Sequence, residues 1–227
     1  MVVISRVFRS SIGRKTTMAL TGAALVLFLF AHLSGNLLLF AGQDAMNAYG
    51  VTLRQFPILL WVARIGLIVV FVTHVVIGTL LTIENRRARP ERYHNQKSIQ
   101  STPASRSMMI TGLLLLAYLV YHLLHFTLGE THSQYFNLTD AQGRHDIYSM
   151  VVLSFQQWPI SVAYIIAMGL LAFHLSHGIP SLFQSIGWNG PRFMPLLSKL
   201  GLAIAVLLLL GYISIPVAVL SGIIGLP

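Results

Sequence analysis

Apolar residues along this chain gather into five long segments separated by polar connections. A helix needs roughly 20 mainly apolar residues to cross the hydrocarbon core of a bilayer, which is about 30 Å thick. All five segments meet that requirement, and the connections are rich in the polar, Gly and Pro residues typical of loops. The pattern predicts an all-α membrane protein in which residues 1–227 form a single domain, a cofactor-binding bundle of five transmembrane helices. We expect the helices over residues 17–41, 59–83, 107–129, 159–183 and 197–222.

Composition supports this class and limits the chemistry. The chain is 55% hydrophobic and only 9% charged, which excludes an ordinary soluble domain. It contains no cysteine, so disulfides, iron–sulfur clusters ligated by this chain and covalently attached haem are excluded. Nitrogen, oxygen or methionine sulfur must hold any cofactor. The first apolar segment lacks a small-residue cleavage site, and we expect it to be retained as a span.

The positions of lysine and arginine predict the orientation of the helices. If the N-terminus is cytoplasmic, twelve of these residues lie inside and three lie outside. The inner set is Arg6, Arg9, Arg14, Lys15, Arg86, Arg87, Arg89, Arg92, Lys97, Arg106, Arg192 and Lys199, and the outer set is Arg54, Arg64 and Arg144. We therefore expect a cytoplasmic N-terminus, an external C-terminus and a basic inner face that docks a partner subunit or membrane lipid. Nucleic acid is not an expected partner, because these charges flank spans and form no binding module.

Four histidines, one in each of the first four predicted spans, are the strongest candidates for function: His32, His74, His122 and His174. An imidazole inside a bilayer needs a polar partner, a proton path or a metal. At 1.5 Å per helical residue, His32 and His122 lie roughly 25 Å and 24 Å from the inner surface, and His74 and His174 roughly 18 Å and 16 Å. The histidines thus form two pairs at levels about 8 Å apart along the helices. This arrangement is the one expected for two haem irons, each held between two helices.

Neighbouring residues add detail to this interpretation. Gly78 and Gly178 follow His74 and His174 by four residues, and a glycine on the ligand's helix face leaves room for a porphyrin edge. His125 lies three residues after His122, and periodicity alone does not choose between them as a ligand. His177 lies nearer the inner surface and is a candidate for a propionate contact. The remaining histidines, His94, His132 and His145, fall in predicted loops, where we expect them to be solvated.

Several motifs carry a resemblance to a known family. They are Gly13-Arg-Lys-Thr-Thr-Met-Ala-Leu-Thr-Gly22, His32-Leu-Ser-Gly-Asn36, His74-Val-Val-Ile-Gly78, Tyr121-His-Leu123 and Phe173-His-Leu-Ser-His-Gly178. The chain resembles the cytochrome b membrane-anchor subunit of bacterial succinate dehydrogenase and fumarate reductase, in its single-chain form with five helices and two haems b. The resemblance implies that His32 and His122 bind the distal haem iron and that His74 and His174 bind the proximal haem iron. It also favours His122 over His125.

The resemblance implies a larger complex in the bacterial cytoplasmic membrane. A flavoprotein subunit would oxidise succinate, an iron–sulfur subunit would relay electrons, and this chain would anchor both and pass the electrons to a quinone, expected to be menaquinone. The chain would be the electron-transfer and quinone-reacting subunit of complex II, in the respiratory chain and the tricarboxylic acid cycle, and would hold no catalytic residue for succinate. The loop 86–106 and the N-terminal arm would form the docking face, and the whole complex could form a higher oligomer.

Other charged residues are candidates for secondary contacts. Arg14 and Lys15 lie where they could pair with proximal propionates, and Arg64 lies where it could pair with a distal propionate. The alternative for all three is that they anchor helices at the headgroup level. No residue is assigned to a quinone site. The acidic residues of the outer loops, Asp44, Glu130 and Asp146, are candidates for a proton route at that surface.

Two alternative functions remain open at this stage. The first is the dihaem b anchor of another respiratory dehydrogenase, such as formate dehydrogenase or hydrogenase, which often places two ligands on one helix. The second is a haem-free transporter whose histidines form a proton or metal path. A transporter of this kind is expected to have acidic partners inside its spans and discontinuous helices. The predicted spans have essentially no Asp or Glu away from their ends.

Overall fold

The computed structural model describes residues 10–88 and 101–227. These described residues are 82% helical and form no strand. Five helical segments are long and apolar enough to cross a membrane, so the expected fold class is confirmed and the chain is a multi-pass membrane protein. They are α2 (Ser11–Asn36) with its extension η1 (Leu37–Ala41), α4 (Pro57–Arg87), α5 (Pro103–His122) with its extension η2 (Leu123–Thr127), α8 (Trp158–Ser185) and α9 (Phe193–Leu220).

Most helices begin before the predicted apolar segments, and the reason is local. The Ser10 hydroxyl caps α2 by accepting a hydrogen bond from the Gly13 amide at 3.0 Å. The Thr102 hydroxyl caps α5 in the same way, at 3.1 Å from the Ser105 amide. Capping residues and first turns are polar, so a search for apolar segments misses them although they continue the helix.

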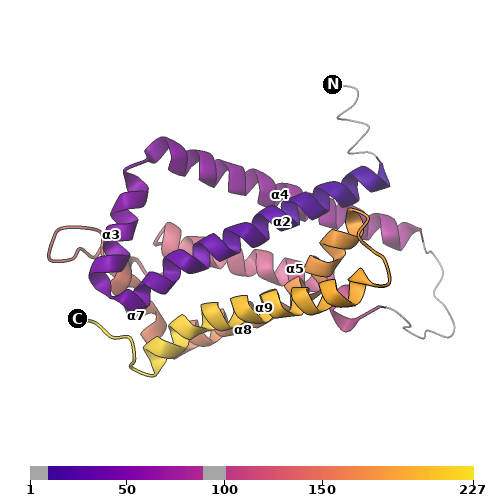
Figure 1. Ribbon diagram of the computed structural model, residues 1–227. Coiled ribbons are helices and arrows are strands. Elements are labelled where there is room, and N and C mark those ends of the chain that lie inside the picture. The colour runs from indigo at the N-terminus through magenta and orange to yellow at the C-terminus, as the bar shows by residue number, and fades with distance from the viewer. Residues whose placement is uncertain (1–9, 89–100) are drawn as a thin grey trace.

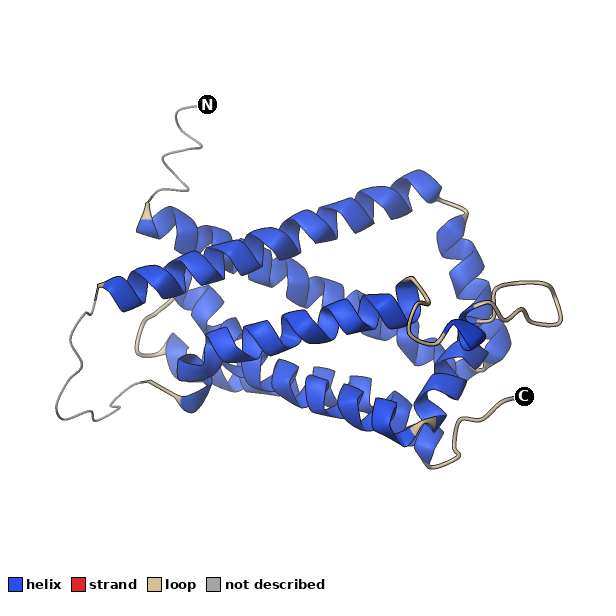
Figure 2. Ribbon diagram, turned by 180° about the vertical axis from the view of Figure 1, so that it is seen from behind, coloured by secondary structure: helices blue, strands red, loops and turns tan. Residues whose placement is uncertain are grey.

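The first four spans form a square of antiparallel helices (Figures 1 and 2). Helix α2 packs against α4 and α8, while α5 packs against α8 and, less extensively, α4. Helices α2 and α5 therefore occupy opposite corners, as do α4 and α8. We call the end of the bundle where α2 begins the basic end. The other end, where α3 (Gln43–Arg54) and α7 (Ile147–Gln156) lie beside the C-terminus, is called the cap end (Figure 1).

The fifth span, α9, packs outside this square along α8 and also contacts α2. Its glycines allow the close approach. A Cβ at Gly201 would lie 2.7 Å from Pro180 of α8, and one at Gly211 would lie 2.5 Å from Leu33 of α2. Small residues commonly bring membrane helices together in this way. Because α9 packs against the outside of the square, it supports the four histidine-bearing helices without contributing a histidine of its own.

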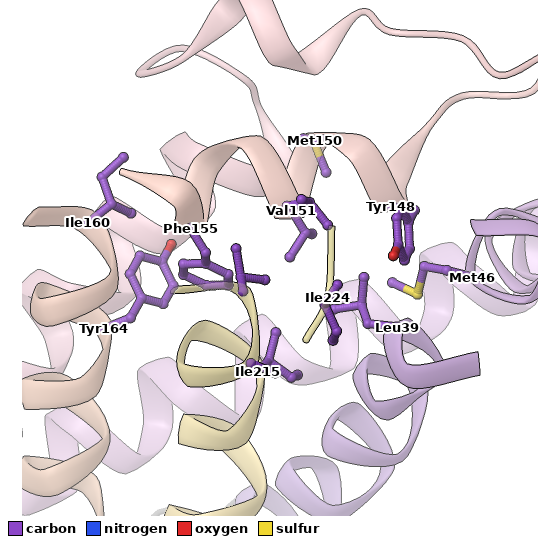
Figure 3. Close-up of a cluster of buried hydrophobic side chains, with 13 residues drawn as sticks. Leu39, Met46, Tyr148, Met150, Val151, Phe155, Ile160, Tyr164, Ile215 and Ile224 are labelled. Carbon is purple, nitrogen blue, oxygen red and sulfur yellow. The ribbon is translucent and has the colours of Figure 1, made fainter. Parts of the chain in front are cut away.

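The cap end is more helical than the sequence predicted. Residues 43–54 and 147–156, expected in polar loops, form α3 and α7, and a short helix, α6 (Ser133–Phe136), precedes α7. Helix α7 is largely apolar, but its 10 residues span only about 15 Å, too little to cross a membrane. It lies across the bundle end, and its residues Val151 and Phe155 join the main hydrophobic cluster with Leu39 and Ile215 (Figure 3).

A polar network ties α3 to the loop before α7. The side-chain amide of Asn47, which is 1% exposed, donates to Asp140 and to Asp146 at 3.0 Å each, and its oxygen accepts from the Tyr148 amide at 3.1 Å. Arg144 donates to Asp140 at 2.7 Å. The buried Asn47 thus uses both sides of its amide to hold the loop against α3.

These hydrogen bonds make the two carboxyl groups more acidic. Burial opposes ionisation of Asp140, but hydrogen bonds from Asn47 and Arg144 outweigh it and lower the pKa of Asp140 to about 2. Burial likewise opposes ionisation of Asp146, and hydrogen bonds from Ser149, Asn47 and Gln43 lower the pKa of Asp146.

Acid is expected to open this end of the protein. Both folded carboxyls have a pKa below the unfolded value of about 3.9, so their stabilising effect is complete above about pH 5 and is lost as the pH falls toward 2. Limited proteolysis of the 130–146 loop across this range measures the opening. In Asn47→Leu the opening should begin at a higher pH, because the variant loses a donor to both carboxylates. An unchanged pH dependence in that variant would contradict the assignment.

Candidate functional site

The four histidines lie on the four helices of the square, one at each corner. His32 of α2 and His122 of α5 come from opposite corners, and their ring centres are 6.0 Å apart with the planes at 84°. His74 of α4 and His174 of α8 come from the other two corners, and their rings contact Thr21 of α2 and Thr111 of α5. Each pair therefore converges from diagonal helices toward the interior of the square.

The two pairs lie farther apart along the bundle than the sequence suggested. His74 contacts Thr21, which precedes His32 by 11 residues, or roughly 16 Å of helix. His174 contacts Thr111, which precedes His122 by the same 11 residues. The estimate of about 8 Å from the sequence was therefore too small.

Threonine hydroxyls hold both histidines of the pair nearer the basic end. The Nδ1 of His74 lies 3.2 Å from Oγ1 of Thr21, and the Nδ1 of His174 lies 3.0 Å from Oγ1 of Thr111. Each hydroxyl also bonds to carbonyl oxygens one turn earlier in its own helix, at 2.8 Å and 3.1 Å for Thr21 and at 3.1 Å twice for Thr111.

These contacts determine which ring nitrogen carries the proton. A carbonyl only accepts, so the single hydroxyl proton of each threonine is donated to a carbonyl. In the arrangement that satisfies all of these contacts, the threonine oxygen accepts from Nδ1–H of the histidine. Both rings are thereby held as the neutral tautomer protonated at Nδ1, with the lone pair of Nε2 available to a metal.

A longer chain of hydrogen bonds runs from His122 to the cap end. The hydroxyl of Tyr164 in α8 lies 3.4 Å from Nδ1 of His122 and 3.0 Å from Nδ1 of His125. The Nε2 of His125 lies 3.1 Å from the hydroxyl of Ser154, which donates to the Met150 carbonyl at 2.7 Å. The Ser154 hydroxyl donates to that carbonyl, so its oxygen accepts from Nε2–H of His125. Nδ1 of His125 then accepts from the Tyr164 hydroxyl, whose oxygen accepts from Nδ1–H of His122. Nε2 of His122 is again left with its lone pair.

The same chain separates His122 from His125 as candidate ligands. His125 is 2% exposed, and both of its ring nitrogens are engaged in hydrogen bonds. The ring also stacks on Phe126 with centres 3.9 Å apart. His122 is half-buried, faces His32, and has one engaged nitrogen. The geometry therefore favours His122 as a ligand and gives His125 a structural role, a choice that periodicity left open.

Aromatic rings line the His32–His122 pair. Phe28 stacks on His32 with ring centres 5.3 Å apart, and Tyr118 stacks on His122 at 5.9 Å. Tyr212 of α9 lies 6.2 Å from the His32 ring and donates its hydroxyl to the Leu29 carbonyl at 2.7 Å. Tyr164 packs against Phe155 of α7, as Figure 3 shows, which fixes the tyrosine at the junction of the bundle and the cap.

The donor set fits a six-coordinate haem b. Two imidazoles on opposite sides of one metal, with metal–nitrogen bonds of about 2 Å, have ring centres roughly 6 Å apart. The His32–His122 separation is 6.0 Å. Within the part of the chain that the structure describes, no hydrogen bond uses Nε2 of any of the four histidines. Each of the four histidines can therefore supply one nitrogen ligand without breaking an existing hydrogen bond, and the ring separation of the His32–His122 pair suits one metal between them.

Thr21 and Thr111 contact two of the candidate ligands, and sequence reasoning missed them although a signal was present. Met18-x-x-Thr-Gly22 and Met108-x-x-Thr-Gly112 are the same motif 90 positions apart, and Phe28 and His32 match Tyr118 and His122 at the same offset. His74-x-x-x-Gly78 matches His174-x-x-x-Gly178 at an offset of 100. Helices α2 and α4 thus repeat as α5 and α8. A search for internal repeats pairs the two threonines, but only the packing of the helices shows that they contact histidines.

The glycines beside the histidines play different parts. Added Cβ atoms at Gly22 and Gly112 would lie 3.4 Å and 3.6 Å from the rings of His74 and His174, which is ordinary van der Waals contact, so both glycines border the imidazoles. A Cβ at Gly178 would meet nothing within 4 Å, whereas one at Gly78 would lie 3.3 Å from Met18. The space expected beside the ligand is therefore clearer on α8 than on α4.

The candidate propionate contacts lie in different surroundings. Arg14 forms an ion pair with Glu84, and Lys15 is exposed at the same end. Arg64 is exposed and lies over the Trp61 ring at 5.3 Å, an arrangement typical of an anchor at the membrane interface. His177 is half-buried one turn after His174. The propionate assignments stay predictions for all four.

The loop histidines are less solvated than expected. The Nδ1 of His132 is buried and has no hydrogen-bond partner within the described residues, and its ring lies 4.8 Å from that of His125. His145 is half-buried against Phe136. The expectation was wrong for these two because the loop folds back onto the cap. His94 lies outside the described residues.

The acidic candidates for a proton route are mostly engaged in structure. Asp146 is 4% exposed and accepts hydrogen bonds from Gln43, Asn47 and the Ser149 amide, the last as the N-cap of α7. Asp44 pairs with Arg144 at 2.9 Å. Glu130 is exposed. Of the three, only Glu130 lies outside this cap network.

Comparisons of the chain with protein-family models, with curated proteins and with solved structures found no match.

Proposed function

We propose that this chain is the dihaem cytochrome b membrane anchor of a bacterial succinate:quinone oxidoreductase. The observation that carries the proposal is the pairing of histidines from diagonal helices at two levels of one bundle. The ring centres of His32 and His122 are 6.0 Å apart. His74 and His174 each contact a threonine through Nδ1, which leaves Nε2 available to a metal. The sequence motifs that resemble the family's cytochrome b subunit support the same assignment.

The chain's own residues would hold, orient and shield the cofactors. When bound, haem b supplies one-electron transfer, and two histidine ligands leave no open position on the iron for oxygen. Thr21 and Thr111 orient the proximal ligands, and Tyr164 orients His122. The aromatic rings around His32 and the cap over the distal level keep water from the interior. The quinone, expected to be menaquinone, would be reduced by electrons that reach this chain from a partner.

Charge placement supports the orientation and the partner. Described arginine and lysine residues cluster at the basic end, where Arg14 and Lys15 begin α2 and Arg86 and Arg87 end α4. Arg6, Arg9, Arg89, Arg92 and Lys97, also assigned to this face, lie outside the described residues. In our proposal the basic end is cytoplasmic and receives the iron–sulfur subunit, which in turn carries the flavoprotein subunit, and the C-terminus lies outside the bacterial inner membrane.

A reduced-minus-oxidised visible spectrum of the purified protein in detergent, with a pyridine haemochrome count, tests the proposal. We expect low-spin haem b at two per chain, because the two pairs provide two bis-histidine sites. Copurification with flavoprotein and iron–sulfur subunits, and succinate-dependent reduction of the haem, would distinguish complex II from a formate dehydrogenase or hydrogenase anchor. An intact, folded preparation from haem-replete cells with no haem would overturn the proposal and favour a histidine-lined transporter.

A further inference from the structure

We infer that Thr21 and Thr111 are a matched pair of positioning residues that set the reduction potential of the proximal haem. The inference rests on the proposed function. Each threonine stands on a helix adjacent to the helix of its histidine, Thr21 of α2 beside His74 of α4 and Thr111 of α5 beside His174 of α8. Neither threonine is itself a ligand.

The geometry at the two positions is the same. Both hydroxyls lie at 3.0 to 3.2 Å from Nδ1 of their histidine, and both bond back to carbonyls three and four residues earlier. In both cases the next residue is a glycine that borders the imidazole, at 3.4 Å and 3.6 Å from the position of a Cβ. The same contact between a threonine and a histidine therefore occurs twice.

The internal repeat explains why the threonine–histidine contact occurs twice. Helices α2 and α5 carry the Met-x-x-Thr-Gly motif 90 positions apart, and α4 and α8 carry the His-x-x-x-Gly motif 100 positions apart. Because α2 and α5 occupy opposite corners of the square, as do α4 and α8, the contact of Thr21 with His74 and the contact of Thr111 with His174 lie on opposite sides of the square. An iron between His74 and His174 would thus have an equivalent hydrogen-bond acceptor behind each of its ligands.

The distal pair differs from this arrangement. His122 has one long contact of 3.4 Å, to the Tyr164 hydroxyl, and His32 has no hydrogen bond from its ring within the described residues. An acceptor on Nδ1–H makes Nε2 a more basic ligand, and a more basic ligand stabilises the oxidised iron. The two threonines should therefore lower the proximal potential, with little effect on the distal one.

Valine substitution tests the inference, because valine keeps the shape of threonine and removes the acceptor. Redox titration of the haem absorbance in Thr21→Val and Thr111→Val is expected to move the proximal component to a higher potential. The double variant should move it by about the sum of the two shifts. The distal component should stay in place. Loss of one component in His174→Ala identifies which is proximal.

Two further variants separate this role from a general effect on folding. Thr79 of α4 makes the same bond to a carbonyl four residues earlier, at 2.8 Å, but has no hydrogen bond to a histidine among the described residues, so Thr79→Val should change neither potential. Thr21→Ser and Thr111→Ser keep the acceptor and should retain the original potential. If a valine variant loses the proximal haem, serine must restore it and Thr79→Val must not lose it.

The inference is overturned if both valine variants keep two haems with unchanged potentials and an unchanged low-spin electron paramagnetic resonance signal. It is also overturned if Thr79→Val gives the same shift, or if serine behaves like valine. Absence of haem from the wild-type protein would instead overturn the proposed function, so the two failures are distinguishable.

Discussion

Replacing His174 by alanine is expected to reduce the haem content from two per chain to one. His174 would supply one of only two nitrogen ligands at the proximal level, and its partner His74 stands alone on the opposite corner helix. Alanine would also leave the Thr111 hydroxyl without its imidazole and open space between α5 and α8. His74→Ala should have the same result through Thr21. Haem extraction and a pyridine haemochrome assay on equal amounts of purified protein measure the loss.

His177→Ala provides the matched control, since His177 lies one turn farther along the same helix and its ring has no hydrogen bond within the described residues. This variant should keep two haems. Two haems in His174→Ala together with one in His177→Ala would show that the proximal ligand on α8 is misassigned, whereas a loss in His177→Ala alone would match its candidate role as a propionate contact. The assignment of the other three histidines would not be affected by that outcome.

The transmembrane helices were predictable from the sequence because each is a long apolar segment of its own. The cap was not, since α3 is polar and α7 is too short to span a membrane, so hydropathy gives both the appearance of loops. What stabilises α7 is burial of Tyr148, Val152 and Phe155 against residues far away in sequence. Tertiary contacts of this kind leave no periodic signal in the segment itself.

The candidate site was predictable in its ligands and not in the residues that orient them. A histidine in an apolar segment is conspicuous, whereas Thr21 and Thr111 resemble any threonine whose hydroxyl bonds back to its own helix, as Thr79 and Thr82 do. Only the packing of adjacent helices separates the two kinds. Likewise, both ring nitrogens of His125 find partners on α7 and α8, which no count along α5 could reveal.

His122→Ala and His125→Ala are expected to have opposite effects, although the two residues are one turn apart. His122→Ala should lose the distal haem, because the ring of His122 lies opposite that of His32, with ring centres 6.0 Å apart. His125→Ala should keep both haems but lower the stability of the protein. It removes a ring that is 2% exposed, together with its hydrogen bonds to Tyr164 and Ser154, at a cost of about 2–4 kcal/mol.

Haem counts and thermal unfolding curves for the two variants measure both effects, and Tyr164→Phe serves as their control. The phenylalanine keeps the packing against Phe155 and removes the hydroxyl that joins His122 to His125. It should keep both haems and lose less stability than His125→Ala, since the buried ring of His125 stays in place. If His125→Ala loses the distal haem while His122→Ala keeps it, the hydrogen-bond chain through Tyr164 runs in the opposite sense. His125 would then be the ligand, and His122 would be the residue that positions it.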